Sequence, residues 1–156
     1  MRSTKGWLWL AALAALAAAL VLSAPTGAGT TATRAVVKTA FNKKLKKRIV
    51  VDGNGRTLYM FTADIDGKPA CTPQTLGTSC VHQWPPLKSK RKPRAAQGIV
   101  ASRLSVVTRT DKIKQAVYNG HPLYHYIGDS KAGNVYGQKY LGAWYVLTPK
   151  GNPIKK

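Results

Sequence analysis

Past its first 24 residues, the chain carries short runs in which apolar and polar residues alternate at every second position. A period of two is typical of β-strands with one buried face. No segment in this part of the sequence has an apolar stripe with a period of about 3.6 residues, the pattern of an amphipathic helix. We therefore expect a mostly β fold of short strands. The predicted strands are 49–51, 56–61, 103–108, 113–118, 121–126 and 143–148.

One pattern of residues occurs twice, with a constant offset of 65 positions. Residues 54–64 and 119–129 share Asn-Gly, then Leu and Tyr, a second aromatic residue two positions after that Tyr, and a closing Asp. Asn-Gly suits a tight hairpin because both residues tolerate positive φ. A repeat of this length indicates a duplicated supersecondary element. We expect a single small domain of two related β-hairpins with internal pseudo-symmetry and irregular loops.

The two aromatic residues of each copy share one face of their predicted strand, and the leucine before them points to the other face. A closing Asp at a strand end can accept backbone N–H bonds of the next turn, or the Tyr hydroxyl of the other copy. Two interpretations stay open: these residues build a duplicated core, or they line a shared ligand cleft. The candidate cleft residues are Tyr59, Phe61, Asp64, Tyr124, Tyr126, Asp129, Trp84 and Trp144.

Residues 1–28 have the layout of a secretory signal peptide. Two basic residues precede an apolar run at 7–22, and small residues follow, so that cleavage is expected after Ala24 or Ala28. The run is short for a membrane span, which needs about 20 apolar residues. An uncleaved anchor is the alternative.

The rest of the chain divides into three predicted parts. Residues 29–45 are rich in Thr, Ala, Gly and Lys without a clear period, and we predict a flexible basic tether there. The two-repeat β domain is expected at 46–151, which is enough chain for one modest core. Residues 152–156 are predicted to be a basic tail.

The charge of the chain is strongly unbalanced. It has 25 Lys and Arg against five acidic residues, all of them Asp, and a net charge of +20. Such a surface attracts polyanions, and salt weakens the attraction. Nucleic acid is not expected, since the leader exports the chain; solvated linkers that keep the protein in solution are the alternative to polymer binding. The candidate polyanion-binding residues are Lys43, Lys44, Lys46, Lys47 and Arg48, then Lys88, Lys90, Arg91, Lys92 and Arg94.

Two cysteines, Cys71 and Cys80, lie nine positions apart. In an exported chain they predict a disulfide, which stabilises by about 2–3 kcal/mol in the chain-entropy model. A metal site is a weak candidate at His82, His121 and His125. On a strand, the second and third of these histidines lie about 13 Å apart and cannot share an ion unless the backbone bends. We predict no metal and no cofactor.

The sequence lacks the usual catalytic motifs. A hydrolase needs a nucleophile beside a base, or a pair of carboxylates. The chain has neither Gly-x-Ser-x-Gly nor His-Glu-x-x-His, and three of its Asp residues lie in predicted turns. We expect no catalytic residues, with an enzyme of unknown class as the alternative.

The repeated pattern resembles a known family, the bacterial secreted-repeat proteins of unknown function, which are lipoprotein-like and carry a Yx(FWY)xxD motif. The resemblance covers 49–151. It implies export without an established activity, but the lipid-attachment Cys of a lipoprotein is absent, so a released or envelope-adsorbed protein is expected. The matching pieces are Tyr59-x-Phe61-x-x-Asp64, Tyr124-x-Tyr126-x-x-Asp129, Cys80-Val81-His82-Gln83-Trp84-Pro85-Pro86-Leu87, Arg109-x-Asp111, Tyr118-Asn119-Gly120-x-Pro122-Leu123-Tyr124, Gly137-Gln138 and Trp144-Tyr145-Val146.

From the sequence we expect a secreted, envelope-associated module with a binding or structural role and no catalytic activity. Its partners would be anionic cell-wall polymers or lipid head groups, held by the basic surface. A metal- or haem-linked redox accessory of the envelope is the alternative.

Overall fold

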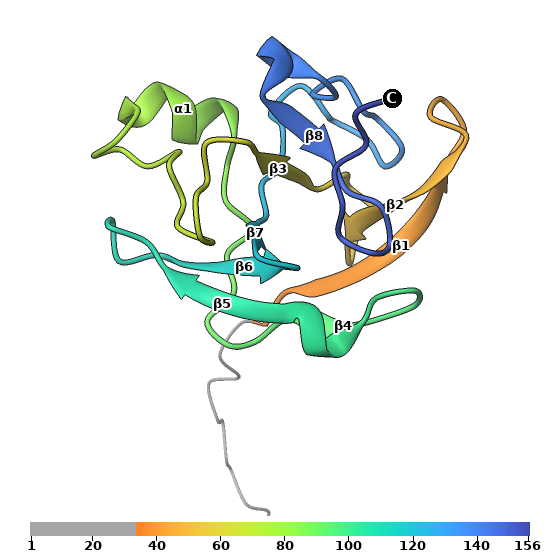
Figure 1. Cartoon of the computed structure of the whole chain (residues 1–156), viewed down its shortest axis with the longest axis horizontal. Helices are drawn as coiled ribbons and strands as arrows, with labels where there is room; N and C mark the ends of the chain where they lie inside the picture. Colours follow the sequence, from red (N-terminus) through yellow and green to blue (C-terminus); the bar gives the residue numbers. More distant parts are fainter. Residues whose placement is uncertain (1–33) are drawn as a thin grey trace, which may run out of the picture. The chain divides into compact units, whose positions relative to one another are not determined.

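The structure, a computed structural model, describes residues 34–156, so the predicted leader (1–28) and residues 29–33 lie outside the described residues. Short strands and long loops dominate this part of the chain (Figure 1). The helical segments are α1 (Gly77–Gln83) and the 3₁₀ turns Ala101–Arg103 and Tyr140–Gly142. The strands are β1 (Val36–Asn42), β2 (Lys47–Asp52), β3 (Tyr59–Phe61), β4 (Arg94–Ala95), β5 (Leu104–Thr108), β6 (Lys114–Tyr118), β7 (His121–Pro122) and β8 (Trp144–Val146).

The strands form several small sheets with the orders β2-β1-β4, β3-β8 and β5-β6-β7. All neighbours are antiparallel except β1 and β4, which are parallel. Cys71 and Cys80 form a disulfide, with their Cα atoms 5.7 Å apart. The predictions of a mostly β domain and of this disulfide are confirmed, whereas pseudo-symmetry of the whole domain stays a prediction. In residues 34–156 no helix combines the length and apolar character that crossing a membrane requires.

The two copies of the motif open on different turns. In the second copy Asn119 and Gly120 have φ of 50° and 79°, the left-handed pair of a tight hairpin between β6 and β7. In the first copy the turn is wider, and one oxygen of Asp52 accepts the N–H groups of Asn54 and Arg56 at 2.9 Å each. After this turn β3 pairs with β8 rather than extending a ladder with β2.

The predicted tether over 29–45 is wrong for 36–42, which form β1. This strand pairs with β2 over six residue pairs and lies inside the sheet, between β2 and β4. Its buried residues are Val37, Thr39 and Asn42, while Phe41 is 61% exposed. Because two of the buried side chains are polar and the largest apolar one faces out, apolar alternation could not reveal the strand.

The predicted basic tail over 152–156 is also corrected, because the chain stays packed as far as Ile154. Ile154 is 4% exposed, and its N–H donates to the carbonyl of Val146 at 2.9 Å. The side-chain amide of Gln138 donates to the carbonyl of Ile154 at 2.6 Å. One apolar side chain among polar neighbours gave no period from which this strand-like contact could be read.

Consecutive residues of each motif copy enter two different cores. Leu58 and Leu123 lie in an aliphatic core, while the residues that follow them, Tyr59 and Tyr124, lie in an aromatic one. The opposite facing of Leu and Tyr in each copy is therefore confirmed. The aliphatic core contains Val37, Val50, Leu58, Leu104, Leu123 and Leu147, and the aromatic core contains Ile49, Tyr59, Trp84, Tyr124, Trp144, Val146 and Ile154, among others.

Helix α1 had no signal in the sequence because it buries none of its residues. A helix without a buried stripe lacks the apolar period that would predict it. Its place is fixed instead by Cys80, which joins it to Cys71, and by Trp84, whose N–H donates to the carbonyl of Cys80 at 2.8 Å.

We expect Leu123→Ala to lower the free energy of unfolding by about 2–5 kcal/mol, because it opens a cavity in the aliphatic core. Leu123 is 0% exposed. Leu141→Ala is the matched control: that leucine is 84% exposed, and the change should stay within about 0.5 kcal/mol. Urea unfolding of both variants measures the difference, and equal effects would contradict the assignment of Leu123 to a packed core.

Candidate functional site

The two copies of the motif meet at their tyrosines. Tyr59 of β3 and Tyr124, which follows β7, form an antiparallel bridge. The N–H of Tyr59 donates to the carbonyl of Tyr124 at 2.9 Å, and the N–H of Tyr124 donates back to the carbonyl of Tyr59 at 3.0 Å. Both side chains are fully buried, and neither residue is helical. Residues that hold the same place in the repeat are therefore neighbours in space.

The tyrosine hydroxyls cross to the closing Asp of the opposite copy. Tyr59 donates to Oδ2 of Asp129 at 2.5 Å, and Tyr124 donates to Oδ1 of Asp64 at 3.2 Å. Oδ1 of Asp129 also accepts the N–H of Tyr136 at 2.9 Å, a backbone contact in the loop that follows it. Burial raises the pKa of both tyrosine hydroxyls, and the Asp that each one faces raises it further.

Asp64 differs from Asp129 in how its oxygens are used. Its Oδ1 accepts both the Tyr124 hydroxyl and the N–H of Ala70, the latter at 2.7 Å. Its Oδ2 is buried and has no hydrogen-bond partner among the described residues. Burial raises the pKa of Asp64 to about 7, although these hydrogen bonds and the charge of Arg109 act in the opposite direction. Asp64 therefore exchanges a proton near neutral pH.

Four rings form a stacked column beside the paired tyrosines. Phe61 stacks on Trp144 with centroids 4.1 Å apart, Trp144 stacks on Trp84 at 3.9 Å, and Tyr126 covers the other side of Trp84 at 4.5 Å. The two Trp planes differ by only 1°. We call Phe61, Trp144, Trp84 and Tyr126 the ring column. It joins the second aromatic residue of each motif copy through two tryptophans from other parts of the chain.

The structure divides the predicted cleft residues between the interior and the surface. Tyr59, Tyr124, Trp84 and Trp144 are buried, with at most 3% exposed, so they serve the core. Asp129 is buried too. The half-buried members are Phe61, Tyr126 and Asp64.

A hollow of about 350 Å³ opens at the Phe61 end of the ring column. Phe61 and Trp144 line it together with residues of α1 and of the 3₁₀ turn before β8. We call it the ring hollow. The lining residues from these two elements include Gln83, Tyr140 and Leu141.

The three histidines lie in different surroundings. Nε2 of His125 lies 3.0 Å from Oδ2 of Asp52, and this contact ties the second motif to the turn of the first. His121 is half-buried beside a hollow of about 480 Å³ that Asp64 also lines, and burial lowers its pKa. His82 is exposed on α1. Within residues 34–156 no group of three or more His, Cys, Asp or Glu is placed to hold a metal ion, and the redox alternative gains no ligand set there.

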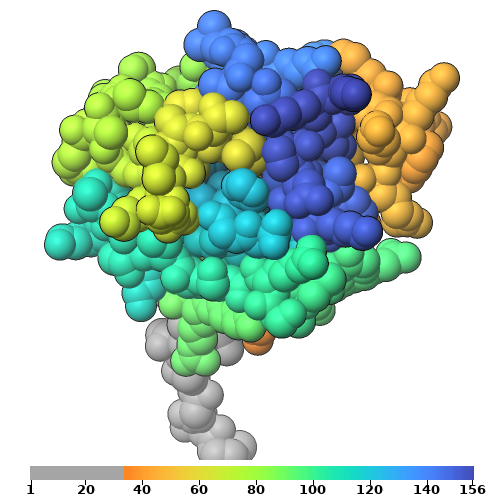
Figure 2. Space-filling view, in the orientation of Figure 1, coloured from red at the N-terminus to blue at the C-terminus, as the bar shows by residue number. Residues whose placement is uncertain are grey.

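The two basic runs lie at opposite ends of β1. Residues 43–48 form the tip of the β1–β2 hairpin, which appears in orange at one edge of Figure 2. Residues 88–94 lead into β4, where Arg94 pairs with Val36 at the start of β1. At about 3.3 Å per residue, the strand places the two runs about 20 Å apart. Every Lys and Arg in both runs is exposed.

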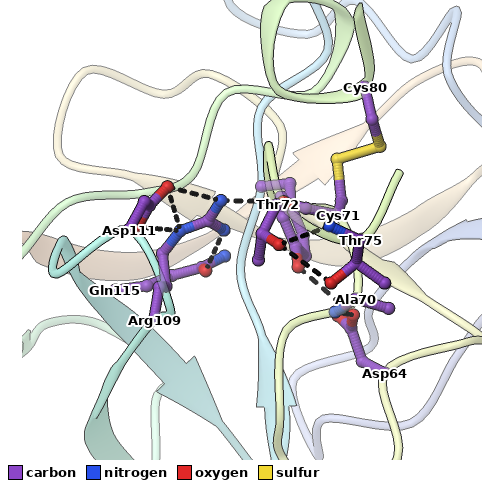
Figure 3. Close-up of a disulfide and its surroundings, with 10 residues drawn as sticks. Asp64, Ala70, Cys71, Thr72, Thr75, Cys80, Arg109, Asp111 and Gln115 are labelled. Atoms are coloured by element: carbon purple, nitrogen blue, oxygen red, sulfur yellow. Dashed lines mark hydrogen bonds and ion pairs between the residues drawn. A yellow bond between two sulfur atoms is a disulfide. The ribbon is translucent and has the colours of Figure 1, made fainter. Parts of the chain in front are cut away.

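Arg109 is a buried cation to which sequence reasoning assigned no role. It is 2% exposed, and its guanidinium donates to Asp111, to Oε1 of Gln115 at 2.8 Å and to the carbonyl of Cys71 at 2.8 Å (Figure 3). It therefore ties the β5–β6 hairpin to the disulfide loop. The available signal was the spacing Arg109-x-Asp111, which entered only as a piece of the family resemblance.

We expect Asp64→Asn to stabilise the protein above pH 7 relative to the unmodified chain. The pKa of Asp64 is about 7 in the fold against an ordinary value of 3.8, so the folded state binds more protons between these values. Wild-type stability therefore falls as pH rises through this window, and the Asn variant lacks that fall.

The measurement is thermal unfolding of both proteins from pH 4 to pH 8. His121 acts in the opposite direction, because its lowered pKa makes stability rise with pH up to its ordinary value of 6.5. The difference between the variant and wild type removes this common contribution. A difference that does not change with pH would contradict the titration of Asp64.

Comparison with known proteins finds a family match for part of the chain. No curated protein and no solved structure matches it. Residues 105–148 match the model of a family described as a secreted repeat of unknown function. This stretch runs from β5 through the second motif copy and Trp144 of the ring column. Over these residues the chain is similar to that family, as its repeated motif indicated.

Proposed function

We propose that the protein is an exported, non-catalytic module that adsorbs to anionic polymers of the cell envelope. The family description of residues 105–148 as a secreted repeat supports the location. The observation that carries the binding proposal is the lack of acidic partners for the basic side chains. Among the Lys and Arg of residues 34–156, only Arg109 forms an ion pair, with Asp111.

Four of the five acidic residues are used inside the fold and Asp66 is exposed, so the acidic residues leave the basic surface unbalanced. Asp52 faces His125, Asp111 faces Arg109, and Asp64 and Asp129 receive the tyrosine hydroxyls. Unpaired cations on one surface create a positive potential that attracts polyanions over roughly a Debye length of 8–10 Å in physiological salt. A polymer that carries a charge on each unit can satisfy many of these cations at once.

Both basic runs are held on ordered backbone, which lowers the entropy lost on binding. In the second run the buried Ser89 accepts the N–H of Ala35 at 3.0 Å and donates to the carbonyl of Arg91 at 2.6 Å. In the first run Oδ1 of Asn42 accepts the N–H of Leu45 at 2.9 Å, which closes the hairpin tip. A linear polymer of about 20 Å or more would reach from one run to the other.

We expect the full chain to bind immobilised inorganic polyphosphate at low salt and to be released as salt rises, since the attraction is electrostatic. Neutral dextran beads are the control matrix. Release at the same point from both matrices, or retention on polyphosphate that high salt leaves unchanged, would contradict the proposal.

A charge-matched pair of variants tests the first run itself. The first variant replaces Lys43, Lys44, Lys46 and Lys47 by Gln, and its control replaces Lys131, Lys139, Lys150 and Lys155 by Gln. All eight side chains are exposed, so both variants lose the same charge from the surface. We expect the first to weaken polyphosphate binding about tenfold more than the control. Equal weakening would assign the binding to net charge rather than to the first run.

A further inference from the structure

We propose that the ring hollow binds an uncharged sugar ring. This site goes beyond the proposed adsorption to polyanions and uses different residues. No Lys, Arg, Asp or Glu lines the ring hollow, in a chain whose net charge is +20. Its volume of about 350 Å³ is at the lower end of small-molecule sites, which range over roughly 300–1,000 Å³.

The wall of the hollow is an aromatic ring backed by other rings. Phe61 has one face on Trp144, with planes 9° apart, and it is half-buried. Trp144 is fixed in turn by Trp84 behind it. A pyranose carries C–H groups on its faces and hydroxyl groups around its edge, so a rigid ring that borders the hollow offers an apolar contact of matching shape.

Leu141 supplies a second apolar contact that the fold itself does not use. It is 84% exposed, and its backbone is left-handed, with φ of 49° and ψ of 23°. Lys139 and Gly142 are left-handed too, with φ of 62° and 63°. Left-handed backbone is uncommon for a residue other than glycine, and it concentrates at functional sites. The turn therefore holds an apolar side chain at the rim of the hollow without burying it.

The polar groups of the hollow are neutral. The side-chain amide of Gln83 donates to the hydroxyl of Tyr140 at 2.8 Å. This leaves Oε1 of Gln83 without a hydrogen-bond donor among the described residues, and it leaves the hydroxyl proton of Tyr140 for an acceptor. One acceptor and one donor at fixed positions suit the hydroxyl rim of a sugar. A phosphate or carboxylate would find no cation there.

The hollow is formed before any ligand binds. Helix α1, which carries Gln83, is joined to the disulfide loop through Cys80 and ends at Trp84 of the ring column. The opposite wall is the 3₁₀ turn, where the hydroxyl of Tyr145 donates to the carbonyl of Gly142 at 2.9 Å. Preformed walls reduce the entropy lost on binding.

Tryptophan fluorescence tests the site directly. In the full chain with Trp7→Phe and Trp9→Phe, the remaining tryptophans are Trp84 and Trp144, both in the ring column. The probes are uncharged β-linked tetramers of glucose and of N-acetylglucosamine. We expect saturable emission changes with at least one probe, and the same affinity at low and high salt. Because salt abolishes polyanion adsorption but should leave sugar binding unchanged, the experiment can contradict one of the two proposals without contradicting the other.

Variants distinguish binding in the ring hollow from non-specific binding to the surface. Leu141→Gly removes the exposed side chain while suiting the left-handed backbone, and Gln83→Ala removes the amide. Each should weaken sugar binding about tenfold, whereas Ile65→Ala, at a residue 70% exposed outside the hollow, should have no effect. Absence of binding up to about 10 mM sugar, equal weakening by Ile65→Ala, or binding of an apolar peptide in place of both sugars would overturn the proposal.

Discussion

The exchange of two backbone hydrogen bonds between Tyr59 and Tyr124 is the constraint on which the rest of the structure depends. It sets the two motif copies antiparallel, and from that register each hydroxyl reaches the Asp of the other copy. The same register sends the neighbouring leucines, Leu58 and Leu123, into the aliphatic core. One pairing between distant parts of the chain therefore determines the places of two cores and of the carboxyl groups of Asp64 and Asp129.

The aromatic core also stabilises the fold through stacked rings. The ring column links Phe61 and Tyr126 through two stacked tryptophans, and each such pair adds about 0.5–1.5 kcal/mol beyond burial. It is buried in the middle and partly exposed at Phe61, which lines a hollow without Lys, Arg, Asp or Glu. The basic runs at the two ends of β1 belong to a different part of the chain, so the two proposed kinds of binding do not compete for residues.

Local rules predicted the parts of the fold that local sequence controls. The tight turn at Asn119-Gly120, the opposite facing of Leu and Tyr, and the disulfide followed from backbone preference, strand geometry and cysteine count. Strand β1 could not be predicted because two of its buried residues, Thr39 and Asn42, are polar. The ring column was missed since Trp84 and Trp144 meet only through tertiary packing. Asp64 and Asp129 each accept a backbone N–H at Oδ1 but differ in which oxygen accepts the tyrosine hydroxyl, and that tertiary contact is not set by local sequence.

The contact of Arg109 with the disulfide loop bears on how the two thiols find each other. The guanidinium of Arg109, between β5 and β6, donates to the carbonyl of Cys71. The N–H of Trp84 donates to the carbonyl of Cys80. Neither anchor involves a sulfur atom. Both anchors would therefore remain in the chain if the two thiols were reduced. The disulfide therefore adds a covalent link between two segments that hydrogen bonds also hold in place.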